Sequence, residues 1–239
     1  MNNTPQTPSV YNVQASEMQA EIQRSFLMRV YAWMTFGLFV TAGAALVTLG
    51  IPGILEMLVS NTIVFFGLII AQLVVVVVLS AAVNKLSPAV AGLLFTGYAA
   101  LTGVTLSILM LVYTSSSVAV TFGVTAATFG IMTLFGYTTQ RDLTKLGSLL
   151  IMGLIGLILA SIVNIFLANS AIYWITTFIG ILIFVGLVAY DTQKLKRMSM
   201  SLGEDGQVAQ KASIIGALAL YLDFINLFLL LLRLLGRRR

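Results

Sequence analysis

Long runs of apolar residues, separated by short polar stretches, dominate the pattern of this chain. Seven such runs cover about 30–50, 62–83, 88–112, 118–137, 147–168, 171–190 and 212–235. Each run has about the 20 residues that an α-helix needs to cross a bilayer. Since backbone N–H and C=O groups in lipid must be bonded within their own segment, every run should be helical. The pattern predicts an all-α, polytopic membrane helix bundle with about seven transmembrane helices.

The polar ends of the chain divide it into three parts. Residues 1–28 form an N-terminal tail, residues 29–236 hold the seven apolar runs, and residues 237–239 are a basic C-terminal tail. Within the N-terminal tail, Met1–Tyr11 is rich in Asn, Thr and Pro, which is typical of disorder. Ser16–Met28 is expected to be helical, either along the cytoplasmic face or as an extension of the first span.

Basic residues are distributed unevenly between the connections. The N-terminal flank and the loops after even-numbered runs carry Arg24, Arg29, Lys85, Arg141, Lys145, Lys194, Lys196 and Arg197, whereas the loops after the first, third and fifth runs have none. By the positive-inside rule, the N-terminus lies in the cytoplasm. Seven full spans would then place the basic tail 237–239 outside, against the rule. The sequence leaves open whether the last run is re-entrant or whether the tail simply crosses.

Composition supports a membrane protein and removes several kinds of chemistry. Of the 239 residues, 59% are hydrophobic and 9% are charged, whereas about 25% of the residues of an ordinary soluble domain are charged. The chain has neither Cys nor His, which excludes disulfides, thiol and histidine catalysis, and zinc or haem sites built on those ligands. The sequence also lacks phosphate-binding and nucleic-acid motifs, so we expect no cofactor and no nucleic-acid partner.

Small residues recur at four-residue spacing within three of the runs. The pairs are Ala99/Gly103, Gly123/Ala127 and Gly156/Ala160. Such pairs let helix backbones approach closely in lipid, where apolar burial does not drive helix association. They indicate a compact bundle.

Two aspartates lie in or against apolar runs. Asp191 follows the sixth run in VGLVAYDTQKLK, and Asp223 lies within the seventh in LALYLDFINLFLLLL. A carboxylate at membrane depth is costly, so it usually faces the bundle interior and marks a proton, ion or substrate path. Because the chain has only eight acidic residues, this pair is the first candidate for a functional site.

Helical periodicity places Asp223 on a small, polar face of the last run. The face consists of Gly216, Ala219, Asp223 and Asn226, and the rest of the run is mainly Leu, Ile and Phe. Counted from Lys211 at ~1.5 Å per residue, Asp223 would lie roughly 18 Å into a ~30 Å hydrocarbon core. We therefore expect Asp223 and Asn226 to point into the bundle.

Each aspartate also has a purely structural interpretation. Asp191 could form an interfacial ion pair with Lys194, worth a few tenths of a kcal/mol. Asp223 could be a neutral acid bonded to the backbone or to Asn226. If the two carboxyl groups meet instead, they cannot both be ionised in a low dielectric, so they would titrate as one unit. Such a pair would be a proton-operated switch without histidine, and its oxygens could hold Ca²⁺ transiently or let it pass.

Four segments resemble the bacterial branch of the Bax-inhibitor-one family, the transmembrane Bax-inhibitor-motif proteins. They are ALTGVTLS at 100–107, GLIGLILASIVNIFL at 153–167, GILIFVGLVAYDTQKLK at 180–196 and GALALYLDFINLFLLLLRLLG at 216–236. The YDTQ and YLDFINLF segments together are the specific part. The resemblance covers nearly everything after the N-terminal tail.

The resemblance implies a seven-helix bundle in which the last helix is central and the other six surround it. Characterised members are linked to a pH-sensitive calcium leak. In them, an Asp at the end of the sixth helix and an Asp in the seventh hydrogen-bond to each other and act as the sensor. Those positions match Asp191 and Asp223. In this picture, the pair holds a gate shut in one protonation state and releases it in another.

The second run departs from the family pattern. Many members have an acid and a base there, roughly as AEL…SAR, and this chain has Gln72 and Ala82 at those positions. A missing intramembrane Arg removes a cation that would stabilise an ionised pair. Lys85, one turn beyond Ala82, could reach inward as a substitute. Gln72, Lys85 and Asn226 are therefore secondary candidates for the ion path.

Two non-catalytic hypotheses follow from these residues and the resemblance. The first is a pH-sensitive cation (calcium) leak channel of the cell (inner) membrane, with the lipid bilayer, protons and Ca²⁺ as its partners. The second is a regulator of another membrane protein, such as a membrane-anchored quality-control protease or a cell-death factor, with the N-terminal tail as the contacting element.

A third hypothesis, an intramembrane aspartyl protease, has the right paired carboxylates for activating water. The chain reads Leu220-Tyr221-Leu222-Asp223, however, where presenilin-like proteases have Gly-x-Gly-Asp, and the last run lacks their Pro-Ala-Leu motif. We therefore expect that the protein is not an enzyme.

Overall fold

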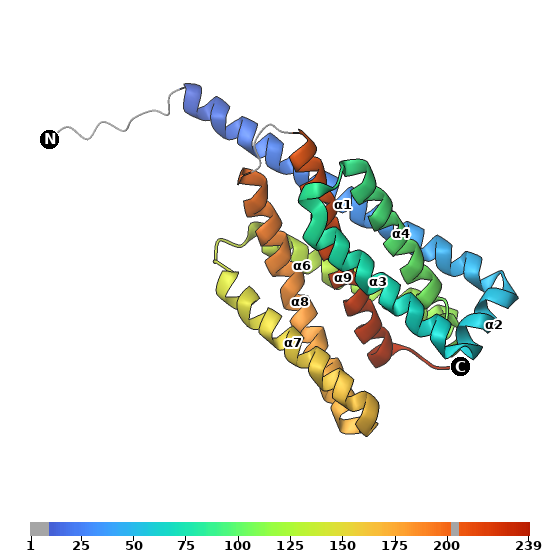
Figure 1. Ribbon diagram of the computed structural model, residues 1–239. Coiled ribbons are helices and arrows are strands. Elements are labelled where there is room, and N and C mark those ends of the chain that lie inside the picture. The colour runs from blue at the N-terminus through green and yellow to red at the C-terminus, as the bar shows by residue number, and fades with distance from the viewer. Residues whose placement is uncertain (1–9, 202–205) are drawn as a thin grey trace.

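The computed structural model describes residues 10–201 and 206–239, and most of them are helical (Figure 1). The helices are α1 (Val10–Leu49), α2 (Pro52–Ser60), α3 (Thr62–Ala82), the 3₁₀ turn η1 (Val83–Lys85), α4 (Pro88–Leu106), α5 (Leu109–Val112), α6 (Ser115–Thr138), α7 (Thr144–Leu167), α8 (Ser170–Ser201) and α9 (Gly206–Leu235). The sequence predicts disorder for Met1–Tyr11. Residues 1–9 lie outside the described residues, and Val10 and Tyr11 belong to α1, which corrects the prediction for these two.

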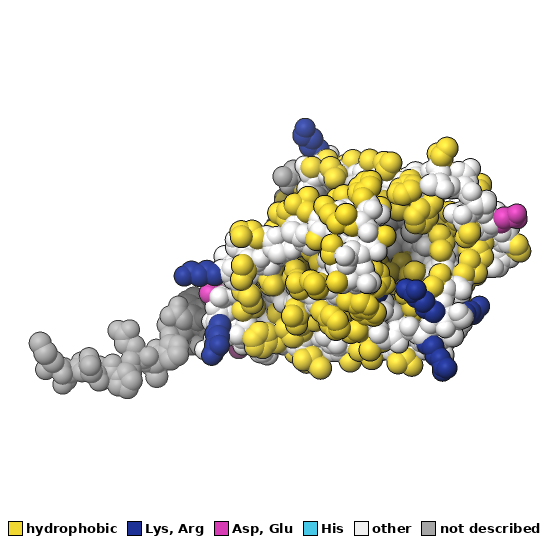
Figure 2. All heavy atoms as spheres, turned by 90° about the horizontal axis from the view of Figure 1, so that it is seen from below, with side chains coloured by type: hydrophobic (Ala, Val, Ile, Leu, Met, Phe, Trp, Pro, Cys, Tyr) yellow, Lys and Arg dark blue, Asp and Glu magenta, His cyan; other side chains and the backbone are white. Residues whose placement is uncertain are grey.

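Seven segments of the described chain are long and apolar enough to cross a membrane. They are Glu17–Leu49, Thr62–Ala82, Pro88–Val112, Ser115–Thr138, Thr144–Leu167, Ser170–Met200 and Gly206–Leu235. Each predicted run falls on one of them, so the prediction of a seven-helix membrane bundle is confirmed. Hydrophobic side chains cover much of the face seen in Figure 2, with Lys and Arg gathered at its margins. Large apolar side chains such as Ile63 and Phe166 are among the most exposed, as expected where lipid is the solvent.

At the start of the chain, the structure decides between two predicted alternatives and adds a helix that was not predicted. α1 is continuous from Val10 to Leu49, so Ser16–Met28 belongs to the same helix as the first span. The short helix α2 then follows, which hydropathy did not reveal. It starts with Pro52, whose fixed φ suits a first helical turn. It ends at Ser60, and the side chain of the next residue, Asn61, accepts backbone N–H groups at the start of α3.

α9 is the central helix, as predicted. Of its most apolar stretch, 67% is buried, compared with 6% for α3 and 0% for α7. α9 packs mainly against α1, α4, α6 and α8, while α3 packs mainly on α4 and α7 on α8. The expectation that six helices surround α9 is thus corrected to four close neighbours, because α3 and α7 form an outer layer whose surface is largely exposed.

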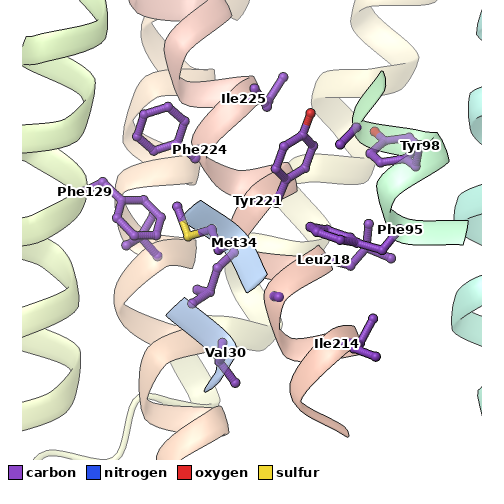
Figure 3. Packing of buried hydrophobic residues seen from close by; sticks show 14 of the residues in the cluster. Val30, Met34, Phe95, Tyr98, Phe129, Ile214, Leu218, Tyr221, Phe224 and Ile225 are labelled. Carbon is purple, nitrogen blue, oxygen red and sulfur yellow. The ribbon is translucent and has the colours of Figure 1, made fainter. Parts of the chain in front are cut away.

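Aromatic side chains hold α9 against its neighbours (Figure 3). Tyr221 meets Phe95 and Tyr98 of α4 edge-on, with ring centroids 5.7 and 5.8 Å apart. On the other side of α9, Phe224 meets Phe129 of α6 at 5.6 Å. Such edge-to-face pairs contribute about 0.5–1.5 kcal/mol beyond the burial of their area. They fix the rotation of α9 about its axis and thereby the direction in which Asp223 points.

One of the predicted small-residue pairs makes a close helix contact. A Cβ at Gly103 would collide with the backbone carbonyl of Thr41 in α1, and Ala99 is fully buried. Nothing lies within 4 Å of such an atom at Gly123 or Gly156. The close packing expected of the other two pairs is therefore wrong within this chain, since both glycines face outward from the bundle.

The C-terminal tail lies at the opposite end of the bundle from the start of α1 (Figure 1). It pairs with the connection after α5: Thr114 N–H donates to Arg237 O at 3.1 Å, and Arg239 N–H donates to Val112 O at 3.0 Å. That connection follows the third span, which ends opposite the N-terminal end. α9 therefore crosses the whole bundle, which answers the question that the sequence left open.

Candidate functional site

Asp191 and Asp223 come together between α8 and α9. Asp223 lies in the middle third of α9 and is only 5% exposed. Aromatic packing on the opposite face of α9 leaves Asp223 turned towards α8. The carboxyl groups of Asp191 and Asp223 are within hydrogen-bonding range of each other. The structure thus favours the interpretation in which the two carboxyl groups meet over the one in which each is satisfied separately.

The contact between the carboxyl groups has a chemical requirement. Oδ2 of Asp223 is buried and accepts no hydrogen bond from a donor group in the described part of the chain. Asp191 is the polar group within reach, and a carboxyl group can donate a hydrogen bond only when it is protonated. Two carboxyl groups at this range can therefore form a hydrogen bond with each other only if at least one of them is protonated.

A cation and an aromatic ring flank Asp191 on α8. Lys194, three residues further, is close enough for its charge to act on Asp191. Lys194 Nζ lies 6.0 Å from the centroid of the Tyr190 ring. The ring packs on Gly147 of α7, where a Cβ would overlap it. Lys194 therefore contributes a positive charge beside Asp191.

The aspartate pair opens onto a cavity of about 630 Å³ between α7, α8 and α9. Asp191, Lys194 and Tyr190 lie on its wall from α8, and Asp223 and Asn226 lie on its wall from α9. The α7 wall is mainly Ile and Leu. The arrangement is a largely apolar groove with two carboxyl groups on one side, which could hold a proton or contact a passing cation.

The structure separates the secondary candidates. Asn226 lines the cavity, as predicted, although its Nδ2 donates to Leu222 O of its own helix at 2.8 Å. Gln72 is turned towards α4, where its Nε2 donates to Thr105 Oγ1 at 2.5 Å and to Leu101 O at 3.2 Å. Lys85 is exposed in η1 and does not line the cavity. The aspartate pair is thus accompanied by Asn226 but not by Gln72 or Lys85.

Asp191 is not at the end of its helix, which corrects the expectation that Lys194, Lys196 and Arg197 lie in a loop. α8 continues to Ser201. Its polar extension is held by Gln193, which accepts from Leu143 N–H at 2.9 Å and donates to Arg141 O at 2.8 Å. These bonds satisfy the backbone of the α6–α7 connection. Asp191 is therefore fixed by helix on both sides.

An ion pair ties the same extension to the start of α7. Arg197 Nη2 donates to Asp142 Oδ1 at 2.8 Å. Asp142 also accepts from the side chain and the backbone N–H of Thr144. Those two bonds, and then Arg197, hold the pKa of the exposed Asp142 carboxyl well below its ordinary value. Asp142 is thus a fixed negative charge in the connection between α6 and α7.

Arg233 is a residue that the sequence analysis did not single out. It lines the cavity of the aspartate pair and also a second cavity of about 600 Å³ near the α7–α8 turn. Its guanidinium lies over the Tyr173 ring, 4.5 Å from the centroid, and donates to Thr177 Oγ1 at 3.4 Å. Its seven-residue spacing from Asn226 on one helical face was the signal that could have identified it.

The site offers few ligands to a metal ion. Across residues 10–201 and 206–239, no three His, Cys, Asp or Glu side chains come together. Ca²⁺ binds tightly through six to eight oxygens, and here two carboxyl groups would have to be supplemented by other oxygen ligands. The geometry suits transient contact with a hard cation as cargo better than permanent binding.

Known proteins resemble this chain over most of its length. The family described as inhibitor of apoptosis-promoting Bax1 matches residues 23–239. The inner membrane protein YbhL of Escherichia coli K12 is 52% identical over 217 residues, covering 90% of this chain and 93% of YbhL. A protein of Borreliella burgdorferi is 45% identical over 91% of this chain and 94% of its own length. The matched range includes α3 to α9 and both aspartates.

Proposed function

The chain belongs to the Bax-inhibitor-one family, and from this membership and the buried aspartate pair we propose that it is a proton-regulated cation leak, with Ca²⁺ as the transported ion. The observation that carries the proposal is the contact between Asp191 and Asp223, which bridges two helices on the wall of a cavity. Its setting would be the inner membrane, with the N-terminus in the cytoplasm.

The free energy available to the proposed switch comes from the change in charge of the aspartate pair when it gains or loses a proton. With one proton on the pair, a hydrogen bond holds α8 to α9. Without it, two like charges face each other, and at about 4 Å and an effective dielectric of ~20 their repulsion is about 4 kcal/mol. A few kcal/mol is enough to change the ratio of two helix arrangements by a factor of hundreds. The proton on the pair would thereby set the width of the cavity beside α9.

Lys194 has a part in this proposal. It lies on the cavity wall at the same end as Asp191 and supplies positive charge that favours an ionised carboxyl group. In relatives, an Arg of the second span would fill this role. Because this chain has Ala82 there, Lys194 is the cation that would help the pair release its proton.

We propose further that the pair is not a catalytic site. An aspartyl protease needs two carboxyl groups that hold a water molecule between them and in reach of a peptide bond. Two carboxyl groups that share a proton are also found in aspartyl proteases, so the sequence rather than the pairing supports this proposal. Leu220-Tyr221-Leu222 precedes Asp223, where presenilin-like proteases have Gly-x-Gly. The expected result is that purified protein does not cleave a transmembrane peptide under conditions in which it passes Ca²⁺.

The test is Ca²⁺ entry into liposomes that contain purified protein and a trapped fluorescent indicator, between about pH 6 and about pH 8, where a perturbed carboxyl pair can titrate. We expect the wild-type flux to depend on pH. In Asp191→Asn and Asp223→Asn, the amide N–H₂ donates permanently to the remaining carboxyl group. Both variants should therefore lose the pH dependence and keep the flux that the wild type shows at its acidic end.

The matched control for these variants is Asp142→Asn, the same substitution at an exposed residue outside the cavity. It should leave the pH profile unchanged. Absence of wild-type flux at every pH would overturn the proposal and favour a member that has lost conduction with Gln72 and Ala82.

A further inference from the structure

The cavity of the aspartate pair continues towards the C-terminal end of α9. The two cavities share Ser161 and Ile165 of α7, Thr176 of α8 and Arg233 of α9. They form one groove that runs from Lys194 at one end of the bundle to the α7–α8 turn at the other. Its long walls are the apolar faces of α7 and α9.

The groove is open towards the bilayer. α7 packs mainly on α8, so the side of the groove away from α8 has no helix packed closely over it. Along the α7 wall, Ile158 is 51% exposed and Ile165 is 75% exposed. In Figure 1, α7 and α8 lie on one side of α9 and α3 lies on the other. A hydrocarbon chain could therefore enter sideways between α7 and α9.

A positive charge stands at one end of this apolar groove. Arg233 lies in the last turn of α9, and no carboxylate in the described chain is within ion-pair distance of it. Tyr173 and Thr177 orient its guanidinium towards the cavity. A guanidinium at the level where a span ends is placed to meet lipid phosphates, which it binds in a forked geometry.

Amide groups beside Arg233 complement the charge. Asn164 and Asn169 line the second cavity. Oδ1 of Asn164 accepts from Asn169 N–H at 2.9 Å, and Oδ1 of Asn169 accepts from Ala171 N–H at 2.8 Å. Since the amide oxygens are occupied, the donating NH₂ ends are available for an anion's oxygens.

We propose that this groove binds one anionic phospholipid, with its phosphate on Arg233 and an acyl chain between α7 and α9. The occupant follows from charge complementarity at the polar end and from the apolar walls that extend away from it. A free phosphate would use only the charge of Arg233 and leave the apolar walls uncovered. A zwitterionic lipid would bring its own cation to an already positive site. The proposal does not depend on ion conduction.

The test compares how phosphatidylglycerol and phosphatidylcholine bind the purified full-length protein in detergent. Native mass spectrometry counts retained lipid, and the unfolding temperature reports stabilisation. We expect wild type to retain phosphatidylglycerol preferentially. Arg233→Gln should weaken that retention about tenfold or more, which is the value of charge-assisted hydrogen bonds. Arg233→Lys should keep part of the preference, and Arg141→Gln, an exposed residue outside both cavities at the other end of the bundle, should keep all of it.

Two further variants test whether binding needs room for an acyl chain in the groove as well as the charge of Arg233. Ile158→Trp fills the groove, whereas Ile155→Trp is on α7 outside the lining residues and serves as its control. The first should abolish phosphatidylglycerol retention with Arg233 intact, and the second should not. The proposal is overturned if wild type retains both lipids equally, if Arg233→Gln behaves as wild type, or if inorganic phosphate stabilises the protein as well as the lipid does. For each variant, the retention of phosphatidylglycerol is compared with that of phosphatidylcholine. A general loss of stability would lower the retention of both lipids and would not change this preference.

Discussion

Two aspartates of this chain show how far surroundings decide what a carboxyl group does. Asp142 is exposed and accepts bonds from Thr144 and Arg197, which favour its ionised form. Asp223 is buried against another carboxyl group and can be satisfied only with a proton. The same residue type therefore serves as a fixed charge at the end of the bundle and as a proton-binding group inside it.

The surroundings of Asp142 lead to a prediction about how the stability of the protein depends on pH. Because folding lowers its pKa from the ordinary 3.8, its contribution to stability is complete above that value and is lost as the pH falls below it. Asp142→Asn should lower the unfolding temperature measured at neutral pH. The difference from wild type should shrink as the pH is brought below 3.8. A difference that stays constant with pH would show that the ionised carboxylate is not responsible.

At the scale of the helices, hydropathy predicts where a helix crosses the membrane but not where it ends or what it touches. The span before Asp191 was predictable, whereas the helical stretch from Asp191 to Ser201 has no apolar run to reveal it. Hydropathy also does not reveal which helices pack against each other, since residues that face lipid are as apolar as those that face protein. This is why Gly103 and Gly123 looked alike in sequence, although only Gly103 touches another helix.

The Gly103 contact makes a prediction about helix packing. Gly103→Ala places a methyl group against the Thr41 carbonyl, and such overpacking costs about 1–3 kcal/mol. Its control is Gly97→Ala in the same helix, where nothing lies within 4 Å. That substitution should raise stability by roughly 0.5–1 kcal/mol, since glycine destabilises a helix interior. Unfolding in mixed micelles measures both, and equal effects would contradict the close approach of α1 and α4.

The whole molecule is a bundle in which α9 runs from one end to the other. The seven spans were accessible from the sequence because apolar length is a local property, whereas the central position of the last helix was implied by the family resemblance. The site was only partly accessible. Lys194 and Arg233 reach the groove through the way α7, α8 and α9 pack, and Gln72 is turned away from it towards α4. Such placements depend on tertiary contacts.

The crossing of α9 makes a prediction about topology. Because the chain has no cysteine, single cysteines can be introduced at Gln140, near the end where α6 stops, and at Arg239. With the N-terminus in the cytoplasm, a membrane-impermeant maleimide should label Arg239→Cys in intact cells and Gln140→Cys only after permeabilisation. Labelling of both from the same side would contradict a complete crossing.

The most direct test of the account is a double-variant cycle on Ca²⁺ flux into liposomes, with Asp191→Asn, Asp223→Asn and the combination measured over the same pH range. Two groups that share one proton act as a unit, so their effects should not add. We predict that each single variant removes the pH dependence and that the double variant removes no more. Additive losses, or a double variant that still responds to pH as wild type does, would show that the aspartate pair is not the switch.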